Sequence, residues 1–120
     1  MSQHETIDYL EFSAPDLVET KRFFEQVFNW EFVDYGPDYT SFSCGDLNGG
    51  FFRAEQVSKS DTGGALVVFY SDDLPATQAK IERAGGVIVK PTFEFPGGRR
   101  FHFTEPSGNE FAVWTESGAP

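Results

Sequence analysis

The chain has 120 residues, a formal net charge of −10 at pH 7 and a sequence pI of about 4.4. That length corresponds to one domain. The charge argues against nucleic acid or an anionic membrane surface as a partner, because both attract Lys and Arg. Acidic residues are spread along the whole chain. We therefore expect an acidic surface, and a site for a cationic ligand is the alternative interpretation.

The chain is apolar enough to form a real core, because 39% of its residues are hydrophobic and 17% are aromatic, with fourteen Phe. We expect most Phe side chains to be buried and a few to line a cavity. Cys44 is the only cysteine, which excludes an intrachain disulfide. No apolar run approaches the ~18 residues of a membrane-spanning helix, and the N-terminus lacks the apolar part of a signal peptide. These features predict a cytoplasmic protein.

The first half of the chain predicts a strand, a helix and three further strands. Residues 6–14 (TIDYLEFSA) alternate between apolar and polar side chains, which indicates a strand. A helix follows, with Asp16 as N-cap and Glu19 completing a capping-box pattern. Its predicted apolar face contains Leu17, Phe24, Val27 and Phe28. The stretches EFVDY, YTSFSCG and GGFFRA then predict short strands, separated by the turn sequences GPD and GDLNGG.

The second half repeats this order after a polar, turn-rich segment, EQVSKSDTGG. ALVVFYS predicts a strand. The next helix has Asp73 as its cap, Pro75 in its first turn and Gly85 at its end. VIVKP, RRFHFT and NEFAVW predict three more strands.

An internal offset relates the two halves. The pair Asp16–Leu17 returns as Asp73–Leu74, 57 residues later. The pattern indicates two βαβββ modules in an α+β fold, at residues 6–55 and 64–116, with a linker at 56–63. Modules of this size bury too little surface to be stable alone, so we expect a single domain over residues 1–120.

Three segments carry a family resemblance: DLVETKRFFEQVFNW, AKIERAGG and FTEPSGNEFAVW. They resemble the glyoxalase/bleomycin-resistance/dioxygenase superfamily, also called vicinal oxygen chelate proteins, over about residues 6–116. They are similar to that family's Asp-Leu helix, its helix-ending Gly pair and its closing Asp-Pro-x-Gly-Asn turn, where Glu105 stands in place of Asp. The resemblance implies an open, barrel-like arrangement of eight strands around a pocket, helices outside, and a homodimer.

In metal-dependent members of this family, a His, Glu or Gln on the first and last strands of each module binds a divalent ion. Matching the motifs places these positions at Tyr9, Leu66, Ala112 and near Arg53. Leu and Ala have no ligand atom, Arg repels a cation, and Tyr is a rare ligand. We therefore expect no metal and no other cofactor at the family's site.

Strand alternation predicts which side chains face the pocket instead. The candidate catalytic residues are His102, Arg100 and Glu110, and the candidate substrate-binding residues are Tyr9, Glu11, Tyr70 and Trp114. His102 could act as a general acid or base, and Arg100 could pair with an anionic group. Glu11, His102 and Glu110 could also form a displaced metal site.

Structural roles are the alternatives for these same residues. His102 and Glu110 could form a purely structural pair across their hairpin, and Arg100 could lie on an exposed turn. Glu11 could sit exposed at the open edge of the barrel. Trp114 could be a packing or dimer-interface residue.

Three functions remain open from the sequence. We favour a small-molecule-binding protein that lacks the family's metal site, with a pocket of aromatic and ionisable residues. The alternative is a lyase- or dioxygenase-like enzyme that uses His102, Arg100 and Glu110, or a displaced metal. The third is a module that binds a protein partner.

Overall fold

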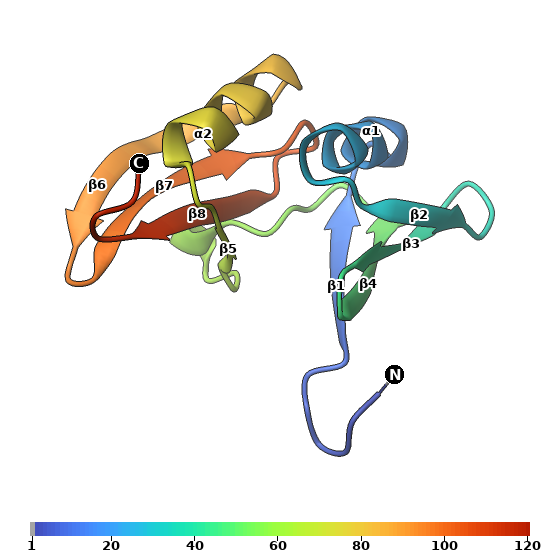
Figure 1. Ribbon diagram of the computed structural model, residues 1–120. Helices are drawn as coiled ribbons and strands as arrows, with labels where there is room; N and C mark the ends of the chain where they lie inside the picture. The colour runs from blue at the N-terminus through green and yellow to red at the C-terminus, as the bar shows by residue number, and fades with distance from the viewer. Residues whose placement is uncertain (1) are drawn as a thin grey trace.

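The computed structural model describes residues 2–120. Two successive βαβββ units follow one another along the chain (Figure 1). The first unit contains β1 (Tyr9–Ala14), α1 (Leu17–Phe28), β2 (Glu31–Asp34), β3 (Tyr39–Cys44) and β4 (Leu47–Arg53). The second contains β5 (Val67–Tyr70), α2 (Leu74–Arg83), β6 (Val87–Phe95), β7 (Gly98–Thr104) and β8 (Glu110–Glu116). A short 3₁₀ turn, η1 (Ser60–Thr62), lies in the connection. The predicted α+β architecture is confirmed.

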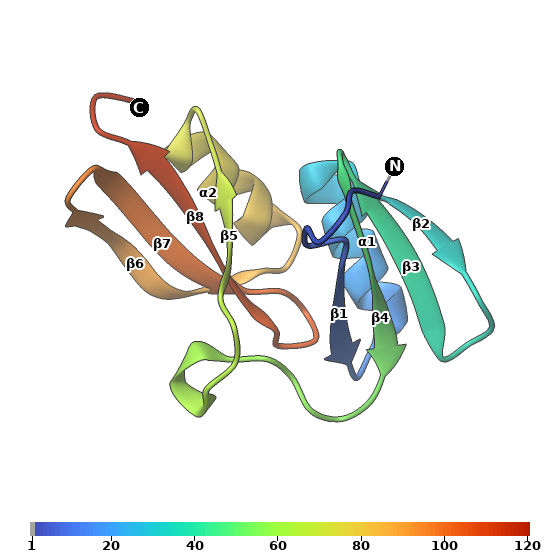
Figure 2. The ribbon, with the colours of Figure 1, turned by 90° about the horizontal axis from the view of Figure 1, so that it is seen from below.

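The eight strands form two four-stranded sheets, in the orders β1-β4-β3-β2 and β5-β8-β7-β6. In each sheet the first strand of the unit pairs in parallel with the last, and the other pairs are antiparallel. Strands β1 and β5 are the edges at which the two sheets approach each other (Figure 2). Within residues 2–120, neither helix combines the length and apolar character needed to cross a membrane.

Asp16 caps α1 as predicted, because its carboxylate accepts a hydrogen bond from the Glu19 backbone N–H at 3.1 Å. The reciprocal half of the predicted capping box is wrong. Glu19 pairs instead with Arg22, at 2.8 Å. The backbone N–H of Asp16 donates to Ser107 Oγ at 3.0 Å, because the turn before β8 reaches the start of the helix. Helix α2 is capped by Asp73, also as predicted.

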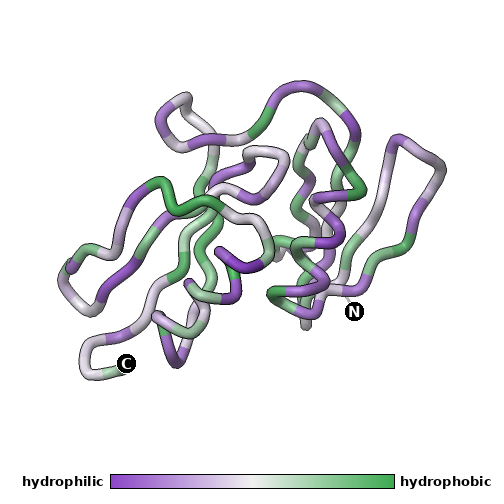
Figure 3. Tube along the Cα trace, turned by 90° about the horizontal axis from the view of Figure 1, so that it is seen from above, coloured by the Kyte–Doolittle hydropathy of each residue, from purple (hydrophilic) through white to green (hydrophobic). Residues whose placement is uncertain are grey.

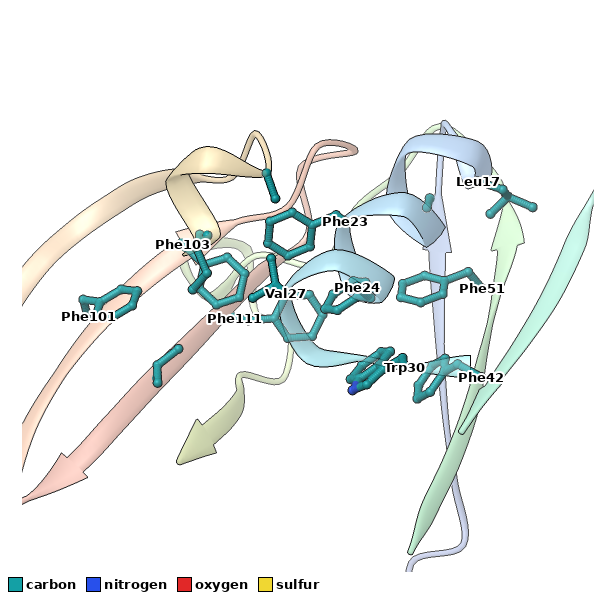
Figure 4. Close-up of a cluster of buried hydrophobic side chains, with 14 of the residues drawn as sticks. Leu17, Phe23, Phe24, Val27, Trp30, Phe42, Phe51, Phe101, Phe103 and Phe111 are labelled. Carbon is teal, nitrogen blue, oxygen red and sulfur yellow. The ribbon is translucent and has the colours of Figure 1, made fainter. Parts of the chain in front are cut away.

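Helix α1 supplies the centre of the core, because its buried face contacts both sheets (Figure 4). Phe24 stacks on Trp30 with ring centroids 4.3 Å apart. The same ring lies 5.7 Å from Phe51 of β4 and 5.4 Å from Phe111 of β8. Phe23, which the predicted face omitted, is fully buried. Along the trace, both helices mix hydrophilic and hydrophobic residues, as expected for helices with one buried face (Figure 3).

A buried polar network joins the β7–β8 turn to the first unit. Glu105 is only 2% exposed. Its carboxylate accepts hydrogen bonds from Thr20 Oγ1 (2.9 Å), the Ser107 N–H (2.6 Å) and Asn109 Nδ2 (2.8 Å). Burial raises the pKa of Glu105, and these hydrogen bonds offset only part of that effect. Asn109 also donates to the Ser13 carbonyl at 2.9 Å, so the turn holds both units together.

The strand faces in β7 and β8 follow the predicted alternation. Phe101, Phe103, Phe111 and Val113 are fully buried on the face that packs against the helices. The alternate residues lie on the other face, where the candidate site is found: Arg100, His102 and Thr104 on β7, and Glu110, Ala112 and Trp114 on β8.

Candidate functional site

His102 and Glu110 come from neighbouring antiparallel strands and lie on one face. In the ladder, His102 is opposite Ala112 and Thr104 is opposite Glu110, so the two side chains are diagonal neighbours. His102 Nδ1 lies 2.7 Å from Glu110 Oε2, and the two side chains are 6% and 11% exposed. The structure therefore joins two of the predicted site residues directly.

Ser60, from the turn η1, completes this pair. Its backbone N–H and its hydroxyl both donate to Glu110 Oε1, at 2.8 Å and 2.9 Å. Burial by itself would raise the pKa of Glu110, but the hydrogen bonds from His102 and Ser60 outweigh it and hold that pKa below its ordinary value. An ionised Glu110 accepts from Nδ1–H of His102. Sequence reasoning missed Ser60, because a polar linker has no periodicity that would place one of its side chains.

The other ring nitrogen of His102 is left available. Nε2 is buried and has no hydrogen-bond partner among residues 2–120. His102 lines a cavity of about 270 Å³, whose remaining lining residues are Lys59, Ser60, Asp61, Val89, Lys90, Thr104 and Glu110. With Nδ1–H directed at the carboxylate, Nε2 of the neutral ring presents a lone pair that can accept a hydrogen bond or a proton.

Arg100 shares the strand and face of His102 but not its cavity. Its guanidinium lies 5.4 Å from the Phe93 ring and 5.8 Å from the Phe95 ring. The Phe93 ring also lies 5.9 Å from the His102 ring, so it contacts both residues. Arg100 Nε is buried and lacks a hydrogen-bond partner within the described chain. Aromatic packing therefore holds Arg100 beside the pair of His102 and Glu110.

Tyr70 and Trp114 form an aromatic corner farther along the same face. Their ring centroids are 5.1 Å apart in an edge-to-face arrangement. The Tyr70 hydroxyl donates to Glu116 Oε1 at 3.0 Å. Trp114 is opposite Arg100 in the ladder and also lies 6.3 Å from Phe95. The two predicted stacking residues are thus neighbours.

Tyr9 and Glu11 belong to a different cluster, on the first sheet. The Tyr39 hydroxyl donates to Glu11 Oε1 at 3.0 Å, and the Tyr9 hydroxyl is hydrogen-bonded to the Tyr39 hydroxyl. Burial, followed by these hydrogen bonds, raises the pKa of Tyr39. No hydrogen bond or cavity found within residues 2–120 joins this cluster to His102. The sequence reasoning missed Tyr39, because the strand register that brings it to Glu11 depends on two hairpins.

The structure refines one of the predicted metal positions, the one expected near Arg53. Arg53 is opposite Ala14 in the β1–β4 ladder and pairs with Asp38 at 2.7 Å. Phe52, one residue earlier, is opposite Ser13 and shares a face with Tyr9 and Glu11. The position near Arg53 is therefore Phe52; it could be predicted only approximately, because the sequence does not fix the length of the β3–β4 hairpin.

The displaced metal site is also not assembled. Glu11 lies in the tyrosine cluster and not beside His102 and Glu110. Among the residues that the structure describes, no group of three or more His, Cys, Asp or Glu side chains is arranged to hold a metal ion.

Residues 6–113 match the family model described as the Glyoxalase/Bleomycin resistance protein/Dioxygenase superfamily. No curated protein sequence matches the chain.

Solved structures of similar fold extend over nearly the whole chain. A glyoxalase/bleomycin resistance protein/dioxygenase family enzyme from Burkholderia phytofirmans has a TM-score of 0.76 and 18% identity, over 92% of this chain and 98% of that one. The fosfomycin resistance protein FosX from Mesorhizobium loti has a TM-score of 0.74 and 20% identity, over 97% and 96%. A FosX variant from Listeria monocytogenes, complexed with Mn(II) and 1S,2S-dihydroxypropylphosphonic acid, has a TM-score of 0.76 and 17% identity, over 92% and 90%. At these identities the likeness establishes the fold alone.

Proposed function

Because the chain belongs to the glyoxalase/bleomycin resistance protein/dioxygenase superfamily, we propose that it binds a small molecule in the His102 cavity without the divalent metal of metal-dependent members. Family membership supports a ligand-binding fold, and the residues of this chain define what the site offers. The observation that carries the proposal is the buried, unpartnered Nε2 of His102. Buried polar atoms nearly always have a hydrogen-bond partner, so a hydrogen bond from a ligand would supply the partner that Nε2 lacks.

The metal part of the proposal rests on the chemistry of the four ligand positions. The Listeria FosX structure contains Mn(II). Here, Leu66 and Ala112 offer no lone pair, and the face position on β4 is occupied by Phe52. Tyr9 alone has an oxygen, and that oxygen is hydrogen-bonded to Tyr39. One phenol among apolar side chains does not fit a divalent ion.

The cavity lining favours a polar ligand that carries a hydrogen-bond donor and charged groups. Nε2 of His102 accepts the donor. Lys59 and Lys90 supply positive charge, and Asp61 and Glu110 supply negative charge. The Thr104 hydroxyl is a further hydrogen-bonding group of the lining. Arg100, Tyr70 and Trp114 extend the face and offer a cation and two aromatic rings to a longer ligand.

Acid–base catalysis at His102, as in a lyase-type enzyme, is the second candidate. A histidine that lines a cavity, with Nδ1 held by a carboxylate and Nε2 free of a hydrogen-bond partner among residues 2–120, has the arrangement of an oriented general base. In that case His102 would remove a proton from the bound molecule, and Glu110 would stabilise the resulting imidazolium. Substitution separates the two candidates: catalysis requires His102, whereas binding by stacking depends more on Tyr70 and Trp114.

We also propose a homodimer in the cytoplasm. Apolar side chains are exposed on both sheets, with Val33, Val68 and Val87 being 56%, 39% and 58% exposed. Burial of these side chains against a second copy would remove them from water. Light scattering coupled to size exclusion should give twice the monomer mass of 13.4 kDa.

A fragment screen by NMR tests the proposed site. We expect small polar molecules, added in the presence of EDTA, to shift amide resonances of β7, β8 and Ser60, and to lose this effect in His102→Ala. His4→Ala is the matched control, because His4 is the only other histidine and its side chain is 91% exposed. Hits that bind equally well to His102→Ala, or that map to other elements, would overturn the proposal.

A further inference from the structure

A second groove lies away from the His102 cavity, between β1, β4 and the linker. Its volume is about 430 Å³. The lining residues are Leu10, Glu11, Phe12, Ser13, Phe52, Gln56, Val57, Ser58, Ala65 and Val67. Glu11 is the only charged residue among them, and most of the others are apolar. The groove therefore combines an apolar wall with a single negative charge.

The Glu11 carboxylate is held in place by the tyrosine cluster. The Tyr39 hydroxyl donates its hydrogen bond to Glu11 Oε1, so in the contact between the two phenols the Tyr9 hydroxyl must be the donor and the Tyr39 oxygen the acceptor. Both phenol protons thus point along one chain toward the carboxylate. A methyl group at Gly50 would collide with both hydroxyls, so this position must be glycine for the two rings to sit here. The chain occupies one oxygen of Glu11 and leaves Oε2 without a hydrogen bond from residues 2–120.

The charge of Glu11 is not neutralised by its own sheet. The positions that share its face are Tyr9, Ser13, Glu31, Val33, Tyr39, Ser41, Ser43, Asn48, Gly50 and Phe52. They include a second carboxylate and no Lys or Arg. Arg53 points the other way and is paired with Asp38 at 2.7 Å. A ligand cation would therefore meet an uncompensated negative charge.

We propose that this groove binds an organic ammonium ion with an apolar body, with the ammonium group on Glu11 and the body along Phe52, Val57 and Val67. A primary ammonium can donate to the free Glu11 oxygen, and charge-assisted hydrogen bonds of this kind are among the stronger polar contacts. The apolar wall covers the rest of the ligand and excludes water from it. The inference does not rest on the proposed function, because it involves different residues.

The test compares phenethylamine, which is protonated at pH 7, with its neutral counterpart 2-phenylethanol. We expect phenethylamine to shift amide resonances of Glu11, Phe52 and Ser58, and to bind at least about tenfold more tightly than the alcohol. Glu11→Gln should weaken phenethylamine binding by about tenfold, because it removes the charge and keeps an acceptor for Tyr39. Glu31→Gln is the matched control, since it removes a carboxylate from the same face outside the groove.

Equal binding of amine and alcohol, unchanged affinity in Glu11→Gln, or no saturable binding below about 10 mM amine would each overturn the proposal. His102→Ala should leave phenethylamine binding unchanged. That variant therefore separates a failure at this groove from a failure of the proposed function.

Discussion

His102 acquires its character from two neighbours on different elements. Glu110 fixes the ring from the adjacent strand, and Ser60 fixes Glu110 from the linker. The hydrogen bond between His102 and Glu110 would be present whether the pair is structural or functional, so this contact alone does not distinguish the two roles. A purely structural pair does not require an Nε2 without a partner among residues 2–120, on a ring that lines a cavity.

The lowered pKa of Glu110 predicts a pH-dependent contribution to stability. A carboxylate with a depressed folded-state pKa stabilises the fold above its ordinary value of 4.5, and this contribution is lost as the pH falls through the folded-state pKa. We expect wild type to be more stable than Glu110→Gln at pH 6, and the difference to shrink below about pH 4.5. Urea unfolding of both proteins at several pH values measures it. A difference that grows on acidification would contradict the assigned hydrogen bonds.

Glu105 should show the opposite dependence. A folded-state pKa above the ordinary value gives a contribution that is present below the unfolded-state pKa and is lost as the pH rises through the folded-state pKa. Relative to Glu105→Gln, wild type should therefore gain stability as the pH is lowered from 7 toward 4.5. The unfolding free energies of the two proteins, followed across this range by chemical denaturation, check the sign.

Truncation of the same side chain tests the network around it. Glu105→Ala leaves Thr20, the Ser107 N–H and Asn109 without their shared acceptor. We expect a loss of about 3 kcal/mol in unfolding free energy, because buried donors lose their partner. A loss below about 0.5 kcal/mol, typical of a surface substitution, would show that water replaces the carboxylate freely.

Side-chain contacts were predictable only where strand alternation determined them. The pair of His102 and Glu110 follows from one short hairpin, so it was among the predicted interpretations. Ser60 and Tyr39 reach their partners from a linker and from a second hairpin, and no local pattern contains that information.

At the scale of elements, α1 packs against both sheets and stabilises both. Phe24→Ala should cost about 4 kcal/mol of unfolding free energy, because it removes a ring that contacts Trp30, Phe51 and Phe111. Val18 lies on the same helix and is 72% exposed, so Val18→Ala should change the unfolding free energy by less than about 0.5 kcal/mol. Thermal or urea unfolding distinguishes the two variants. Equal effects would mean that α1 is not the centre of the core.

The order and type of elements could be predicted from the sequence because each has strong local signals. Asp16 and Asp73 are the caps that the pattern indicates, and β7 and β8 bury their predicted faces. Exact register could not be predicted, because the lengths of hairpins set it. The position expected near Arg53 is therefore occupied by Phe52, and β6 continues to Phe95 through two register shifts that interrupt its alternation.

At the scale of the whole molecule, the two modules share one core and one polar network. We expect them to unfold together, since α1 packs on both sheets and Glu105 links them. Trp30 lies in the first module and Trp114 in the second. Trp114→Phe therefore leaves Trp30 as the fluorescent reporter of the first module, and Trp30→Phe leaves Trp114 as the reporter of the second. In each variant, the fluorescence midpoint in urea should coincide with the midpoint by circular dichroism. Separate midpoints within one variant would show independent modules.

The measurement that tests the central claim most directly is the metal content of protein purified without chelator or affinity metal, followed by titration with divalent ions. The account predicts less than one Ni, Zn, Fe, Mn or Co per chain, and no change in melting temperature on titration. One tightly bound ion per chain, lost in His102→Ala or Glu110→Ala, would contradict a metal-independent site.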